Sequence, residues 1–158
     1  MNYITIKINK AYVFDAVDET TAYLGAKAIG DDTAYSRVAT VDADRTLLEN
    51  FWTEACSLAT SNFKQFLSSI SENRVSHTID ITANYEVTIS ISTQYDNNLT
   101  SSIEASLFEF FTNYIVGKWC ELTNKTEAEK YLTTATGMMK DVMSNIYYRK
   151  RPKRPNIE

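Results

Sequence analysis

Apolar residues recur at helical spacing in four stretches of this chain. They cover residues 11–28 and about 43–71, a stretch that begins near Ser101, and another that begins at Thr126. Spacings of three and four residues place these side chains on one face of each stretch, so four helices are predicted. Residues 29–42 show no clear period and are expected to form a long connection.

Between residues 75 and 95 the pattern changes to alternation. Most odd positions are apolar and nearly every even position is polar, which is typical of a β-hairpin with one apolar face. Because the apolar positions are odd on both arms, the loop must have an odd length, and residues 84–86 are the simplest choice. An isolated hairpin is marginally stable, so its apolar face is expected to cover the helices or a neighbouring subunit. The predicted register pairs Ala83 with Val87, Ile81 with Ile89, and Ile79 with Ile91.

The two ends of the chain complete the predicted fold. Residues 1–8 lack the basic-then-apolar layout of a signal peptide and are expected to form a short strand. The fold class is therefore α+β and predominantly helical: a four-helix bundle with one β-hairpin between helices 2 and 3, and an extended C-terminal arm. Residues 1–148 are predicted to form the helical domain, with the hairpin at about 75–95, and residues 149–158 to form the arm.

Two glycines fall inside the last two predicted helices. Gly117 and Gly137 lower the helix propensity of these stretches. Close approach of a neighbouring backbone, within the chain or between copies, is the expected reason for both.

The C-terminal arm carries a charge opposite to that of the body. Residues 149–158 hold five Lys or Arg residues and one Glu, whereas the other 148 residues hold 11 basic and 19 acidic residues. Pro152 and Pro155 cannot continue a helix and favour extended backbone before them. The arm therefore stays in solvent, contacts nucleic-acid phosphates without sequence specificity, or lies in a groove of another protein. We favour the groove, because Tyr147 and Tyr148 at the root of the arm are suitable apolar anchors.

Catalytic and metal-binding patterns are not evident in the sequence. The single histidine, His77, has no Ser or Cys placed near it by sequence for it to activate, and one histidine excludes multi-His metal sites. Cys56 and Cys120 lack CxxC spacing and fall on predicted apolar helix faces, so both are expected to be buried thiols. There is no Gly-rich phosphate loop and no apolar stretch long enough to span a membrane. We therefore expect no enzyme activity, no catalytic residue, no cofactor and no metal.

Four stretches of the chain carry a resemblance to a known family. They are residues 18–27, 44–56, 110–119 and 147–152. With the order of the predicted elements, they resemble the head-to-tail adaptor (connector) proteins of tailed bacteriophages. The local sequence is also similar to neck or ring proteins of crAss-like phages that infect gut Bacteroidales. In the adaptor family, a ring forms under the portal, and the C-terminal arm of each subunit inserts into or clasps the portal.

The resemblance implies a structural virion protein that is assembled in the host cytoplasm. It would form an oligomeric ring, usually dodecameric in this family, that joins the portal to the tail and lines a channel for genomic DNA. Expected partners are other copies of the chain, the portal protein and further neck or tail ring proteins; DNA would pass without specific binding, and no membrane is involved. The implied portal contacts are Tyr147, Tyr148, Arg149, Lys150, Arg151, Pro152, Lys153, Arg154, Pro155 and Ile157. The implied subunit contacts are helix faces and, on the hairpin, Ile79, Ile81, Val87, Ile89 and Ile91.

Two alternatives stay open at this stage. Related helical folds serve as tail-completion or terminator rings lower in the neck, and the sequence does not distinguish these levels. The other alternative is a small nucleic-acid-binding module that uses the basic arm as a clamp. The net charge of −4 argues against a protein that binds nucleic acid with its whole surface.

Overall fold

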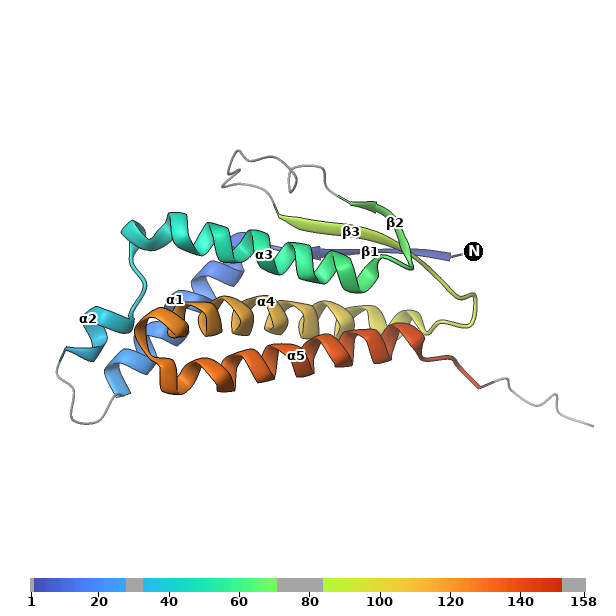
Figure 1. Cartoon of the computed structure of the whole chain (residues 1–158). Helices are drawn as coiled ribbons and strands as arrows, with labels where there is room; N and C mark the ends of the chain where they lie inside the picture. The colour runs from blue at the N-terminus through green and yellow to red at the C-terminus, as the bar shows by residue number, and fades with distance from the viewer. Residues whose placement is uncertain (1, 28–32, 71–83, 152–158) are drawn as a thin grey trace, which may run out of the picture.

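Most of the described chain is helical, and one small antiparallel sheet completes the fold (Figure 1). The computed structural model describes residues 2–27, 33–70 and 84–151. The predicted α+β class and the N-terminal strand are confirmed, and three predicted helices begin within one residue of their observed starts. In chain order, the elements are β1 (Asn2–Ile8), α1 (Lys10–Lys27), α2 (Ala34–Val38), α3 (Arg45–Phe63), β2 (Leu67–Ile70), β3 (Tyr85–Ile91), α4 (Thr100–Thr123) and α5 (Lys125–Tyr147).

The sheet is built around β3, which lies between β1 and β2 and is antiparallel to both. Its outer face is polar, and the hydroxyls of Thr5 and Thr88 lie 2.9 Å apart on it. An alternating sequence thus produces one polar and one apolar face, as the pattern in residues 85–91 predicts. The apolar face is buried in the core through Ile6, Ile8, Tyr85, Val87, Ile89 and Ile91.

The predicted register of the hairpin is wrong. Tyr85 and Glu86, expected in its loop, are the first two residues of β3. Val87 faces Ile6 of β1 on one side and Ile70 of β2 on the other. Both edges of β3 are occupied there, so no edge remains for the predicted first arm, which lies outside the described residues. The physical reason is that the N-terminal strand, distant in sequence, supplies one of the two partners.

Helix α3 is shorter than predicted. It ends at Phe63 rather than near residue 71, and a turn leads into β2. In the turn, the N–H of Phe66 donates to the Phe63 carbonyl (2.8 Å), and the Phe66 carbonyl accepts from the N–H of Ser90 in β3 (2.7 Å). Pairing with the sheet therefore overrides the helical spacing of the apolar residues in this stretch.

The connection predicted at 29–42 contains the short helix α2. The indole N–H of Trp119 donates to the Val38 carbonyl (2.6 Å), and the Nε of Arg37 donates to the Thr123 carbonyl (3.2 Å). These two hydrogen bonds join α2 to the C-terminal half of α4. A hydrogen bond to the indole is required here because a buried Trp N–H without a partner is costly.

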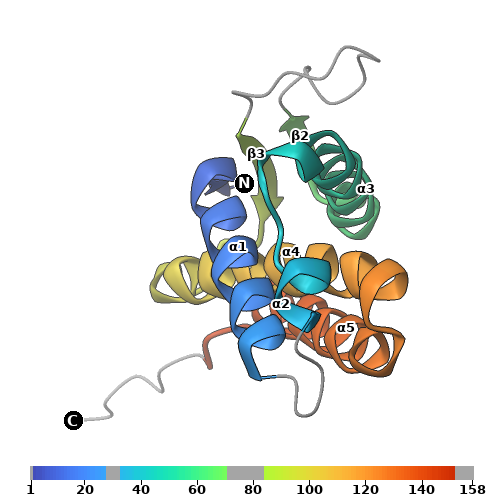
Figure 2. The ribbon, with the colours of Figure 1, turned by 90° about the vertical axis from the view of Figure 1, so that its left-hand side faces the viewer.

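Helix α4 is the central helix of the domain. It packs against α1, α3, α5 and β1, and Figure 2 shows α1 crossing it, α3 above it and α5 below it. A Cβ at Gly117 of α4 would lie 2.7 Å from Cγ of Leu132 in α5, so this glycine permits the close helix contact that its position predicts. A Cβ at Gly137 would meet no atom within 4 Å, so packing within the described chain does not explain that glycine. None of the helices in the described ranges has the length and apolar character of a membrane span.

Candidate partner-binding site

The end of α5 forms the root of the C-terminal arm. The helix ends at Tyr147, and the backbone of Tyr148 is extended (φ −61°, ψ 139°). The guanidinium of Arg149 donates to the carbonyls of Ile146 (3.0 Å) and Tyr148 (3.1 Å). A cation at this position compensates the unpaired carbonyls and the negative end of the helix dipole. Arg149 therefore provides a favourable contact between the basic arm and the end of α5.

Lys150 attaches the arm root to the turn that precedes α4. Its backbone N–H donates to the Gln94 carbonyl (3.1 Å), and its ammonium lies 3.1 Å from a carboxylate oxygen of Asp96. That carboxylate also accepts the backbone N–H of Asn98 (3.1 Å). One backbone contact and one side-chain contact thus fix where the chain leaves the body.

Tyr147 packs on the turn between α3 and β2. Its ring lies edge-to-face with Phe66, with 5.3 Å between the ring centroids, a favoured geometry for aromatic pairs. Its hydroxyl donates to Oε1 of Gln65 (3.3 Å). Tyr147 is thus held by the body although 51% of its surface is exposed.

These contacts gather at one end of the domain. In Figure 1 the end of α5, the beginning of α4 and the N-terminus of β1 lie together at that end. The residues that follow Tyr147 are all exposed there: Tyr148, Arg149, Lys150 and Arg151. The structure therefore brings together the first part of the predicted portal-binding set. The remaining members, Pro152, Lys153, Arg154, Pro155 and Ile157, lie outside the described residues.

Sequence reasoning identified the arm but missed the surface that holds it. Gln65 and Phe66 contact Tyr147, and Gln94 and Asp96 contact Lys150. The pair Asp96 and Asn98 is a recognisable turn signal. However, no local pattern connects this turn to position 150, because the two are neighbours only in the folded chain.

Replacement of Asp96 by asparagine is expected to loosen the arm root. The pKa of Asp96 is lowered from 3.8, first by the N–H of Asn98 and then by the Lys150 side chain. Because the folded pKa lies below the unfolded one, the ionised carboxylate stabilises the folded root above about pH 4, and this contribution is lost as the pH falls through the folded pKa. At neutral pH we expect trypsin to cleave after Arg149 and Lys150 several-fold faster in D96N than in the wild type. D141N, on the exposed surface of α5, is the control, and equal cleavage of D96N and wild type would contradict the assignment.

The hairpin residues that were predicted to contact a neighbouring subunit are buried where the structure describes them. Val87 and Ile89 have no exposed surface, and Ile91 is 5% exposed. All three pack in the core of the chain itself, so the structure does not present them to a neighbouring subunit. Ile79 and Ile81 lie outside the described residues.

The candidate reactive groups are buried or not described. Cys56 and Cys120 are both buried, as predicted, and burial raises the pKa of the Cys120 thiol to about 11. This thiol therefore stays protonated at neutral pH and is a poor nucleophile. Within residues 2–27, 33–70 and 84–151 there is no group of three or more His, Cys, Asp or Glu side chains that could hold a metal ion. His77 lies outside these ranges.

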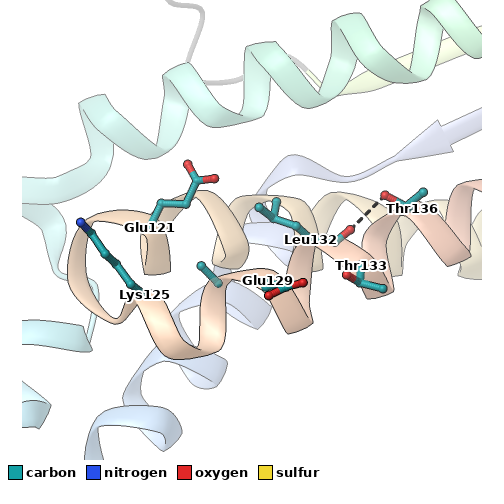
Figure 3. A pocket seen from close by; sticks show the side chains of 7 residues that line it. Glu121, Lys125, Glu129, Leu132, Thr133 and Thr136 are labelled. Carbon is teal, nitrogen blue, oxygen red and sulfur yellow. Dashed lines mark hydrogen bonds between the residues drawn. The ribbon is translucent and has the colours of Figure 1, made fainter.

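A surface groove lies between the end of α4 and the first half of α5 (Figure 3). Its volume is about 520 Å³. The hydroxyl of Thr136 donates to the Leu132 carbonyl (3.1 Å), so this group is used within the helix. No pair of groups in the lining has the arrangement of a nucleophile and a base, and we assign no reaction to it. The lining residues are Glu121, Lys125, Ala128, Glu129, Leu132, Thr133 and Thr136.

The fold and the site together define a mostly helical protein with a small antiparallel sheet and a basic terminus that is anchored at one end of the domain. Comparisons of the chain with protein-family models, with curated proteins and with solved structures found no match.

Proposed function

We propose that this protein is a structural component of a tailed phage that forms an oligomeric ring at the neck, joins the portal to the tail and lines the DNA channel. The C-terminal arm docks on the portal, and the body packs against further copies in a ring of portal-matched number. The observation that carries this proposal is the anchored arm root. Helix α5 stops at Tyr147, and the contacts of Lys150 hold the next residues at one end of the body.

An anchored root favours docking of the residues beyond it. The residues next to the body are already ordered in the free protein, so less conformational entropy is lost when the arm binds a partner. The exposed side chains at the root include Tyr148, Arg149 and Arg151, and Tyr and Arg are enriched in interfaces. With five basic residues in its last ten positions, the arm suits an acidic groove on its partner.

The body supplies the other surfaces that a ring requires. A closed ring joins two different surfaces of each subunit, and α1 and α3 are two separate helices that pack on α4 (Figure 2). The body outside the arm has eight more acidic than basic residues. An acidic channel wall would repel DNA phosphates and let the DNA slide. This part of the proposal requires the acidic excess to face the lumen.

Deletion of residues 149–158 tests the proposal. Tagged full-length protein, purified from a productively infected culture with nuclease treatment, is expected to recover portal and tail proteins in stoichiometric amounts. The deletion variant is expected to lose the portal, because the arm makes that contact, while it keeps its fold. A variant with Lys125, Lys130 and Lys140 of α5 replaced by glutamine is the matched control, since it removes positive charge from an exposed helix and leaves the arm intact.

The same experiment separates the two alternatives. A nucleic-acid-binding module is favoured by the basic arm, and it would recover nucleic acid that is released by nuclease or high salt and lost in the deletion variant. A terminator ring lower in the neck would recover tail proteins without the portal. Recovery of the tagged protein alone would contradict every version of the neck proposal.

A further inference from the structure

The outer edge of β1 is a second feature that indicates a binding partner. In the order β1-β3-β2, β1 is an edge strand. All seven of its residues pair with β3 in a regular register, from Asn2 opposite Ile91 to Ile8 opposite Tyr85. Among the described residues, no other strand and no further backbone hydrogen bond occupies the opposite edge. An edge of this kind presents a row of backbone donors and acceptors to another chain.

The usual protections of an edge strand are nearly absent from β1. Proline, a β-bulge and several charged residues are the common devices that prevent pairing with another chain. β1 contains no proline, its register with β3 has no shift, and Lys7 is its single charged residue. The strand is thus able to accept a partner strand along its whole length.

The sequence of β1 is self-complementary in the antiparallel direction. If two copies pair around Thr5, all seven residues of each strand have a partner. On the polar face, Thr5 meets Thr5 of the second copy, and Tyr3 meets Lys7, so no two lysines face each other. Threonine pairs and contacts between a cation and an aromatic ring are both favourable across strands.

The buried face of β1 fits the same register. Ile4 then lies opposite Ile6 of the second copy. Ile6 is completely buried in its own chain, whereas Ile4 is only partly buried. A second copy would therefore cover the apolar surface that Ile4 leaves exposed.

We propose that two copies of this chain pair edge to edge through β1, around a two-fold axis, and form one continuous six-stranded antiparallel sheet. Such a contact uses the same surface on both copies. The inference does not depend on the neck proposal. A closed ring joins two different surfaces of each subunit, so the β1 pair would be a contact separate from those of the proposed ring. The chain's own arm is a poorer partner for this edge, because Pro152 and Pro155 are three residues apart. If the arm were a strand, one of these two prolines would face β1, and proline has no N–H to donate to it.

Cysteine scanning of β1 tests both the contact and its register. The native thiols, Cys56 and Cys120, are buried, so they do not interfere. Under mild oxidation we expect T5C to form a disulfide-linked dimer at least about tenfold faster than Y3C or K7C alone, since only position 5 faces itself. A mixture of Y3C and K7C is expected to form the mixed dimer. Absence of the T5C dimer, or equal rates for all three single variants, would overturn the proposal.

A charge variant tests the contact without a cross-link. Tyr3 is 59% exposed, so Y3K should keep the fold while it places two pairs of lysines opposite each other in the dimer. Sedimentation of the wild type is expected to show a concentration-dependent dimer of the 18.0 kDa chain, and Y3K is expected to weaken it about tenfold. The double variant Y3K/K7E should restore the dimer through opposite charges. A wild type that stays monomeric at every concentration, or a dimer that Y3K leaves unchanged, would show that the edge does not pair in this way.

Discussion

Replacement of Lys10 by methionine is expected to lower the free energy of unfolding by about 3–5 kcal/mol, because it leaves a buried carboxylate without its counter-ion. The ammonium of Lys10, at the start of α1, forms an ion pair with the carboxylate of Glu49 in α3, and the two side chains are only 4% and 5% exposed. The backbone N–H of Lys10 also donates to the side-chain carbonyl of Asn84 (3.0 Å). Urea denaturation followed by far-UV circular dichroism measures the loss. For a domain of this size, it corresponds to a fall in Tm of roughly 10 °C.

Two further variants show whether K10M lowers the free energy of unfolding through the unpaired buried charge or through lost packing. In K10M/E49L both charges are replaced by apolar side chains, so the double variant should recover most of the stability that K10M loses. Glu54, whose contact with Lys118 is 3.9 Å long and whose side chain is 50% exposed, provides the exposed control: E54Q should cost less than about 1 kcal/mol. If the losses in K10M and E49L simply add in the double variant, the ion pair does not act as a unit and this assignment is wrong.

Replacement of Phe111 by alanine is expected to cost about 3–5 kcal/mol, because it opens a cavity at the centre of the core. Phe111 lies on α4 and has no exposed surface. Its ring centroid is 4.7 Å from that of Trp52 on α3, 5.3 Å from that of Tyr85 on β3 and 5.6 Å from that of Phe110. One side chain thus joins α3, α4 and the central strand, and its loss affects all three contacts.

The fluorescence of Trp52 reports on the loss of the Phe111 ring. Trp52 packs directly on Phe111, so F111A should change the emission spectrum of the folded protein as well as the urea midpoint. Y12A, at a position on α1 that is 65% exposed, should change stability by no more than about 0.5 kcal/mol. A loss below about 1 kcal/mol in F111A would mean that the core around α4 collapses to fill the space, in conflict with the packing described above.

Local sequence patterns predicted the helices that are defined by their own apolar faces. α1, α4 and α5 begin within one residue of the predicted positions, because helical spacing over five or more turns is a strong local signal. α3 was predicted too long, since residues 64–70 continue the helical spacing and yet take part in a turn and in β2. There the backbone bonds to β3 outweigh the local preference.

Strand pairing was the part of the fold that the sequence could not supply. The alternation in residues 85–91 correctly indicated a strand with one buried face. It did not indicate that β1 would be its neighbour, because an alternating pattern specifies which face is apolar and leaves the partner strand open. The predicted loop at residues 84–86 was wrong for this reason.

The candidate site also has features that the sequence predicted and contacts that it did not predict. The sequence predicted a basic, extended arm from residue 149 with Tyr147 and Tyr148 at its root, and the predicted apolar helix faces indicated that Cys56 and Cys120 are buried. The contacts of Lys150 with Gln94 and Asp96 were not predictable, since they join segments that are more than fifty residues apart. The buried ion pair between Lys10 and Glu49 was missed because lysine and glutamate are normally exposed, and no local pattern marks the exception.

By itself, the sequence determined the elements with a clear apolar period, the burial of their apolar faces and the separate, basic character of the C-terminal arm. These properties depend on residues within one or two turns of each other. Only the tertiary structure decided which strands pair, where α3 ends, which charges are buried together and where the arm is anchored. Each of those outcomes depends on hydrogen bonds and ion pairs between segments that meet only after the chain has closed long loops, and such contacts leave no periodic trace in the sequence.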